Sequence, residues 1–157
     1  MQETSPVFEK IKNLLEEKGV SYQLLEHRPV FTSEEAAKVR GTGLKQGAKA
    51  IIFFADKKPI LIVVNGDKHI DVKKFKQKYN IKDLRLLKSE EIKQLTGLEI
   101  GAIPPFGNIM NLPTYMDAEV MKNEKIVFNA GSHTRSVKMR SFDFVNLCKP
   151  IIGNFRE

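Results

Sequence analysis

The stretch Gly41-Thr42-Gly43-Leu44-Lys45-Gln46-Gly47-Ala48-Lys49 leads directly into the apolar run Ala50-Ile51-Ile52-Phe53-Phe54-Ala55. Glycines and lysines without apolar periodicity predict a loop, whereas the apolar, partly β-branched run has the length of a strand. Lys49 lies at the junction. A buried ammonium must be paired or neutralised, so a lysine here suits a strand end that opens into a polar cavity. The alternative is that Lys49 is only the first, solvated residue of an edge strand, since lysines usually lie at exposed positions.

A second apolar run follows the first after a short polar break. Asp56-Lys57-Lys58 separates residues 49–55 from residues 59–65, which predicts an antiparallel hairpin. Both runs are apolar almost throughout, so we expect two central strands that are covered on both faces. Three further strands are predicted, the third being the last of the chain: 22–26, 126–131 and 136–139.

Capping residues mark the starts of most of the helices that we predict. Ser5 and Pro6 fit the N-cap and the first position of a helix that ends at Gly19. Thr32 and Glu35 have the spacing of a capping box, and Asp71 and Ser89 are the expected N-caps of two later helices. Thr32 is therefore interpreted first as a cap, although a cap residue on a pocket rim can also offer its hydroxyl to a ligand. The predicted helices cover these residues: 6–18, 32–40, 72–79, 90–96 and 142–148.

Length and composition predict one folded domain over residues 1–157. The chain is 41% hydrophobic and 29% charged, which allows a real core and excludes a disordered protein. Its formal net charge of +7 suits a partner rich in phosphate, although ion pairing in a lysine-rich protein is an alternative. Four lysines of the helix at 72–79 either face solvent or belong to an RNA-backbone footprint: Lys73, Lys74, Lys76 and Lys78.

Several classes of protein are excluded or disfavoured. Cys148 is the only cysteine, so no internal disulfide can form and a reducing compartment is expected. No secretion signal is present, and the longest apolar run is too short to cross a bilayer. We therefore expect a soluble, cytoplasmic protein that does not associate with a membrane. No zinc-ligand spacing, phosphate loop or dinucleotide motif occurs, and Cys148 has no obvious base. We therefore expect no metal, no cofactor and no cysteine nucleophile.

Four short motifs, taken together, resemble a known family. They are His27-x-Pro-x-x-Thr32-x-x-x-Ala36-Ala37, the glycine-rich approach to Lys49, Gly101-x-x-x-Pro105-Phe106-Gly107, and Phe128-Asn129-Ala130-Gly131 followed by Ser132-His133. Their order and spacing resemble the YbaK-like family, the single-domain relatives of the editing domain of bacterial prolyl-tRNA synthetase. The resemblance runs from about Phe8 to Leu147. It implies an α+β fold with a mixed, mostly antiparallel sheet that is curled into a partial barrel and flanked by helices.

The resemblance also implies a trans-editing hydrolase that deacylates mischarged aminoacyl-tRNA. Small amino acids such as alanine, serine or cysteine on tRNA-Pro are the expected substrates. In such proteins the lysine matching Lys49 is the functionally critical residue, the loop at 101–105 holds the terminal adenosine, and the threonine matching Thr32 lines the aminoacyl pocket. Gly101 is expected to share the catalytic role. The other residues expected to contact the substrate are Ala102, Ile103, Pro105, Phe106, Gly131, Ser132 and His133.

The chemistry agrees with the residues that the chain offers. An aminoacyl ester needs little beyond a placed water and stabilisation of the developing oxyanion, so no side-chain nucleophile is required. Lys49 is expected to be cationic and to anchor the carbonyl or the terminal phosphate, not to act as a base. Backbone N–H groups of Gly101 and Ala102 are expected to orient the adenosine or the oxyanion. Either Ile103 or Phe106 should bound the pocket.

Two other functions stay open at this point. One is a non-catalytic tRNA- or nucleotide-binding module on the same fold. The other is a protein-interaction domain in which the basic surface only aids solubility. His133 alone is more often a surface loop histidine than a group that positions water. The expected partners are aminoacyl-tRNA and, as a candidate, prolyl-tRNA synthetase, and the expected state is a monomer.

Overall fold

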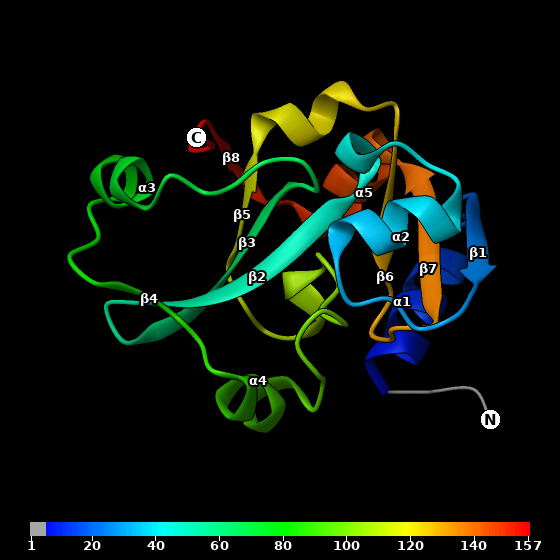
Figure 1. Ribbon diagram of the computed structural model, residues 1–157, viewed down its shortest axis with the longest axis horizontal. Coiled ribbons are helices and arrows are strands. Elements are labelled where there is room, and N and C mark those ends of the chain that lie inside the picture. The colour runs from blue at the N-terminus through cyan, green and yellow to red at the C-terminus, as the bar shows by residue number, and fades with distance from the viewer. Residues whose placement is uncertain (1–5) are drawn as a thin grey trace.

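The β2–β3 hairpin lies at the centre of the larger of two β-sheets in the computed structural model, which describes residues 6–157 (Figure 1). β2 (Ala48–Ala55) and β3 (Lys58–Asn65) pair antiparallel along their whole length. Asp56 and Lys57 form the turn, and both have positive φ angles, 48° and 74°, which suit a two-residue hairpin. The predicted hairpin is confirmed, with a turn one residue shorter than expected.

Three short strands extend this sheet, giving the order β4-β2-β3-β5-β8. β4 (Leu84–Leu86) pairs antiparallel with β2, whereas β5 (Thr114–Asp117) pairs parallel with β3. β8 (Ile151–Gly153) pairs parallel with β5. β4 and β8 were not predicted, because three residues are too few to show a period of two. The strand at 136–139 is therefore not the last of the chain, as was expected.

The smaller sheet contains β1 (Tyr22–Glu26), β7 (Arg135–Arg140) and β6 (Lys125–Asn129), in that order and antiparallel throughout. A parallel bridge between Gly47 and Val127 joins β6 to the residues that enter β2. The sheets are curled but do not close into a barrel (Figure 1). The expected α+β class, with mixed and mostly antiparallel strands, is confirmed.

Helices flank the sheets and begin close to the predicted caps. Thr32 and Asp71 each accept a hydrogen bond from a first-turn backbone N–H, at 3.1 and 3.0 Å. Lys88, not Ser89, occupies the N-cap of its helix, and Ser5 lies outside the described residues. The helices are α1 (Pro6–Glu17), α2 (Ser33–Arg40), α3 (Val72–Tyr79), α4 (Ser89–Thr96) and α5 (Ser141–Cys148), with short 3-10 turns η1 (Leu44–Gln46), η2 (Gly107–Ile109) and η3 (Ala118–Lys122). None of the helices in residues 6–157 is long and apolar enough to span a membrane.

Two apolar clusters hold these elements in place. In the larger one, the rings of Phe106, Phe128 and Phe144 meet with centroids 4.9 to 6.3 Å apart. The smaller one packs α3 against the hairpin, with Phe75 and Phe155 edge to face at 4.9 Å. β3 is buried almost throughout, as expected of a central strand. β2 is only half-buried near its start, and this is where a cleft opens.

Candidate active site

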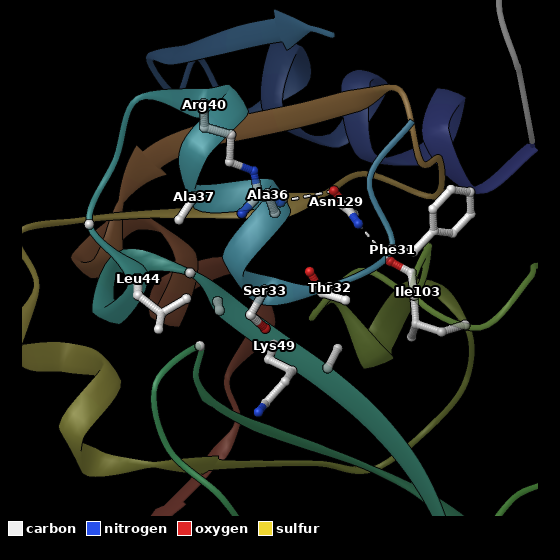
Figure 2. A pocket seen from close by; sticks show the side chains of 16 residues that line it. Phe31, Thr32, Ser33, Ala36, Ala37, Arg40, Leu44, Lys49, Ile103 and Asn129 are labelled. Carbon is white, nitrogen blue, oxygen red and sulfur yellow. Dashed lines mark hydrogen bonds between the residues drawn. The ribbon is translucent and has the colours of Figure 1, made fainter. Parts of the chain in front are cut away.

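A cleft of about 140 Å³ lies between α2 and the start of β2, and Phe31 and Thr32, which precede α2, also line it (Figure 2). Thr32 and Ser33 face it from the beginning of α2, and Lys49 faces it from β2. The remaining lining residues come from α2 and the residues before it, from the glycine-rich segment and β2, from Gly66, from the loop at 101–103 and from the end of β6: Phe31, Ala36, Ala37, Arg40, Gly43, Leu44, Gly47, Ala48, Ala50, Gly66, Gly101, Ile103 and Asn129. The fold thus brings together residues from five separate stretches of the chain.

Lys49 is half-buried in the wall of this cleft. Its Nζ donates a hydrogen bond to the backbone carbonyl of Lys68 at 2.9 Å. Burial lowers the pKa of Lys49 below 10.5, while the negative charges of Glu34 and Asp67 act in the opposite direction. Lys49 pairs with Val64 of β3, is only partly exposed and lines the cleft, so it is not simply a solvated residue at a strand end. Of the two alternatives for this lysine, the strand end that opens into a cavity is the one observed.

Gly101 reaches the cleft from a loop more than fifty residues further along the chain. Its φ angle is +89°, a conformation that side-chain-bearing residues rarely adopt. Its carbonyl accepts a hydrogen bond from Asn129 Nδ2 at 2.6 Å, and its N–H has no partner among residues 6–157. A Cβ at this position would lie 3.2 Å from His133 Cε1. Gly101 thus carries an unpaired backbone donor and lines the same cleft as Lys49.

Two polar residues of the cleft, Arg40 and Asn129, were not predicted as site residues. Arg40 donates from Nη2 to Asn129 Oδ1 at 2.9 Å (Figure 2). Its Nε also donates to Ser136 Oγ at 2.9 Å. Ser136 Oγ also lies 2.8 Å from His27 Nε2. Burial lowers the pKa of Arg40 to about 10, and no carboxylate pairs with it within the described chain. Asn129 belongs to the Phe128-Asn129-Ala130-Gly131 motif, so the sequence pointed to its neighbourhood. Arg40 is only the charged last residue of a short helix, and nothing else in the sequence indicated a role in the site.

Ile103 lines the cleft, in agreement with its predicted place in the pocket wall, and Ala50 lines it too. Both residues, together with Lys49 and Gly101, also border a second, more apolar groove of about 420 Å³. That groove runs over the exposed face of β2 and is bounded further out by aliphatic side chains such as Ile100. The site therefore has two compartments that meet at Lys49 and Gly101.

Three other residues of the 101–105 loop region do not line the cleft. The N–H of Ala102 donates to the carbonyl of Glu99 at 3.1 Å, so it is not available to orient a substrate. Pro105 is buried, and its carbonyl contacts the thiol of Cys148 at 3.6 Å. Phe106 is completely buried in the larger core cluster. The expectation that its ring bounds the pocket was wrong, because an aromatic residue in a loop packed inward instead of lining the cavity.

Gly131, Ser132 and His133 form the turn between β6 and β7, and all three are buried behind the cleft instead of lining it. Ser132 Oγ lies 3.0 Å from Thr134 Oγ1. His133 Nδ1 lies 3.0 Å from the carbonyl of Val30, and its ring packs on Phe31 at 4.7 Å. These contacts support the loops that carry Gly101 and Thr32.

The structure offers no sign of other catalytic machinery among the residues it describes. Burial raises the pKa of the Cys148 thiol to about 11, which disfavours the thiolate that a cysteine nucleophile needs. Residues 6–157 contain no cluster of three or more His, Cys, Asp and Glu side chains that could hold a metal ion.

Comparisons with known proteins agree on one type of domain. Residues 27–147 match the family described as the aminoacyl-tRNA editing domain. Over 162 aligned residues the chain is 28% identical to the multifunctional Ser/Thr-tRNA deacylase ProXp-y of Escherichia coli (strain K12), which covers 100% of this chain and 97% of that protein. It is 30% identical over 116 residues to the prolyl-tRNA editing protein ProX of Acetoanaerobium sticklandii, covering 72% and 69% of the two chains. A crystal structure described as a candidate trans-editing enzyme for prolyl-tRNA synthetase superposes with a TM-score of 0.85 at 25% identity over 99% of both chains.

Proposed function

This chain belongs to the aminoacyl-tRNA editing domain family, and we therefore propose that it hydrolyses the ester bond of mischarged aminoacyl-tRNA in trans. One observation supports this most directly. Lys49, which carries an ammonium, and Gly101, whose N–H is unpaired within residues 6–157, line one small cavity together with Thr32. Two fixed donors next to a space the size of a small side chain suit an ester carbonyl that develops negative charge.

The reaction follows from these two donors. A water oxygen attacks the carbonyl carbon of the ester and forms a tetrahedral oxyanion. Lys49 and the N–H of Gly101 stabilise that charge, and they need no reorganisation because each is already held in place. The bond to the ribose oxygen then breaks, that oxygen takes up a proton that the attacking water has lost, and the products are the free amino acid and uncharged tRNA. Because a positioned water attacks the ester directly, this route needs no covalent enzyme intermediate.

The cleft suits a small amino acid. Ala36, Ala37 and Leu44 are among its apolar lining residues, and the cavity of about 140 Å³ leaves room for few atoms. Thr32, Ser33, Arg40 and Asn129 give it polar walls, which favour a side chain that carries a hydroxyl. We propose serine as the preferred group, with alanine and cysteine as weaker substrates. The name of the Escherichia coli relative, a Ser/Thr-tRNA deacylase, supports a hydroxyl-bearing side chain.

The second compartment suits the terminal adenosine. The apolar groove meets the cleft at Gly101, so a base lying on its aliphatic walls would leave the ribose ester beside Lys49. We further propose tRNA-Pro as the carrier and prolyl-tRNA synthetase as a candidate partner, in view of the relatives named for prolyl-tRNA editing. A single editing domain over residues 1–157, acting as a monomer in the cytoplasm, completes the proposal.

The decisive experiment is deacylation of a panel of mischarged tRNAs by the wild type, Lys49→Ala and Lys58→Ala. Lys58 is an exposed lysine of the same hairpin and lies outside both compartments, so it is a matched control. We expect wild type and Lys58→Ala to remove serine, and Lys49→Ala to lose about 100-fold or more of the rate, as for loss of one oxyanion donor. Tight binding of tRNA without hydrolysis of any aminoacyl group would favour the non-catalytic module instead.

A further inference from the structure

A basic groove lies beside the cleft, over the smaller sheet. It has a volume of about 450 Å³ and is separate from both compartments of the site. Four of its seven lining residues are lysines, and each comes from a different element, η1, η3, β6 or β7: Lys45, Lys122, Lys125 and Lys138. The other three are Gln46, Asn123 and Glu124, so only one carboxylate faces it.

The groove is held rigidly against the segment that forms the cleft. Asn123 Nδ2 and Asn65 Nδ2 both donate to the carbonyl of Lys45, at 2.9 and 3.0 Å. Ser141 Oγ in turn donates to the carbonyl of Asn123 at 2.6 Å. Lys45 sits in η1 next to Leu44, which lines the cleft. The distance between the cleft and the basic groove is therefore fixed by the fold.

The β6–β7 ladder connects the two sites on one face of the smaller sheet. Ser136, which holds Arg40 under the cleft, faces the same side as Lys138 and Arg140, because side chains of a strand alternate. Lys125 lies directly opposite Arg140 and shares that side. From Ser136 to Arg140 the strand rises about 13 Å. Cations thus continue along the sheet from the floor of the cleft into the groove.

The charges in this groove are largely unpaired. Lys122 forms an exposed ion pair with Glu119 at 3.3 Å, but Lys45, Lys125 and Lys138 have no ion pair within the part of the chain that is described. Lys125 and Arg140 face each other across the ladder, and like charges directly opposite destabilise a sheet. A structural role would favour an acidic partner at one of these positions. An anionic ligand that bridges the cations accounts for their arrangement.

We propose that this groove binds the phosphodiester backbone of the RNA strand whose aminoacylated end occupies the cleft. The inference rests on the proposed function, since it takes the substrate to be a tRNA. It also decides whether the lysines on α3 face solvent or belong to the RNA-backbone footprint. That helix packs at the far end of the larger sheet, away from β6 and β7 (Figure 1). The lysines of α3 then form a solvated face, and the groove supplies the phosphate contacts.

The test compares two triple variants that remove the same charge. Lys122→Gln, Lys125→Gln and Lys138→Gln change the groove, and Lys73→Gln, Lys74→Gln and Lys76→Gln change α3. Affinity for uncharged tRNA-Pro transcript is measured between 50 and 200 mM salt. We expect the groove variant to lose about 10- to 100-fold in affinity at the lower salt. Its slope of log affinity against log salt concentration should become shallower by about 2 to 3. The α3 variant should match the wild type in both measurements. The corresponding triple Lys→Arg groove variant, which keeps the charge, should retain the affinity.

Hydrolysis of 3′-seryl-adenosine, which has no phosphodiester, serves as the second readout. The groove variant should hydrolyse it at the wild-type rate, which also shows that the variant is folded. Wild-type affinity and salt slope in the groove variant would overturn the proposal, as would an equal loss in the α3 variant. If the wild type hydrolyses no aminoacyl ester, the proposed function fails, yet the binding of uncharged tRNA still decides whether the groove is an RNA site.

Discussion

At the scale of single residues, the site depends on two groups that are unremarkable by themselves. Lys49 is one of many lysines, and Gly101 has no side chain. The fold makes them useful by burying the ammonium and by pinning the carbonyl of Gly101 to Asn129, which leaves an N–H free. Preorganised donors of this kind act where charge develops, so small displacements should be costly.

Gly101→Ala tests this preorganisation. A side chain here is strained at φ +89°, and its Cβ would crowd His133, so the loop must shift. We expect deacylation to fall about 10-fold or more, because 1.4 kcal/mol of lost transition-state stabilisation is a factor of ten. Gly97→Ala is the matched control, since Gly97 also has a positive φ, 76°, but has open space around it. Equal rates for both variants would contradict the role of Gly101.

Substitution of Phe106 should affect stability, whereas substitution of Ile103 should affect substrate selectivity. Phe106→Ala removes a fully buried ring and should cost about 3–5 kcal/mol of stability, measured by denaturant unfolding, without changing the ratio of seryl to prolyl hydrolysis. Ile103→Ala should enlarge the junction of the two compartments and raise the relative rate on prolyl-tRNA. Discrimination by an apolar wall is worth about 1–3 kcal/mol for one methylene, and this substitution removes three carbon atoms, so the change in the ratio should be measurable. A changed ratio of seryl to prolyl hydrolysis in Phe106→Ala would show that the Phe106 ring does bound the pocket.

At the scale of elements, α2 is the part that closes the cleft. It has eight residues, and a helix of that length is marginal by itself in water. Thr32 caps its start, Gly41 ends it with a φ of 70°, and Ala36 is its buried residue. The same helix carries Ser33 and Arg40 into the site. Its stability and the shape of the cleft are therefore linked.

Thr32→Val should weaken both the helix and the site. It removes the hydroxyl that caps the first turn, which typically costs about 1 kcal/mol, and it removes a polar group from the cleft wall. We expect faster amide hydrogen exchange in α2 and a lower kcat/KM on seryl-tRNA. Thr32→Ser keeps the hydroxyl and should retain both properties. A fall in kcat/KM for Thr32→Ser as large as for Thr32→Val would show that the hydroxyl is not what matters.

At the scale of the whole molecule, one buried carboxylate ties the end of the chain to the larger sheet. Asp117 of β5 accepts hydrogen bonds from the backbone N–H groups of Phe155 and Arg156, at 2.8 and 2.9 Å, and pairs with the Arg156 guanidinium at 2.9 Å. Burial by itself would raise the pKa of Asp117, but these donors lower it overall, below 3.8. Asp117 is completely buried, so its charge depends on these partners.

The protein should therefore lose stability in acid through Asp117. A carboxylate whose pKa is lowered in the folded state contributes stability that is present above its unfolded value, here 3.8, and that is lost as the pH falls below it. Asp117→Asn should lower the free energy of unfolding at pH 7 by about 3 kcal/mol and flatten its dependence on pH below about 4. Asp83→Asn, at an exposed position, should keep the wild-type pH profile. A wild-type profile in Asp117→Asn would contradict the assignment.

The sequence by itself determined the parts of this protein that depend on neighbours along the chain. The hairpin around 56–57, the caps at Thr32 and Asp71, and the four motifs could all be read from local patterns of polarity, glycine and capping residues. Tertiary structure decided what has no local signal: the side to which Phe106 turned, the burial of His133, and the meeting of Arg40, Asn129 and Gly101. Strands β4 and β8 formed because a sheet edge was available to pair with them. Such contacts join residues tens of positions apart, and their energies exist only once the chain has folded.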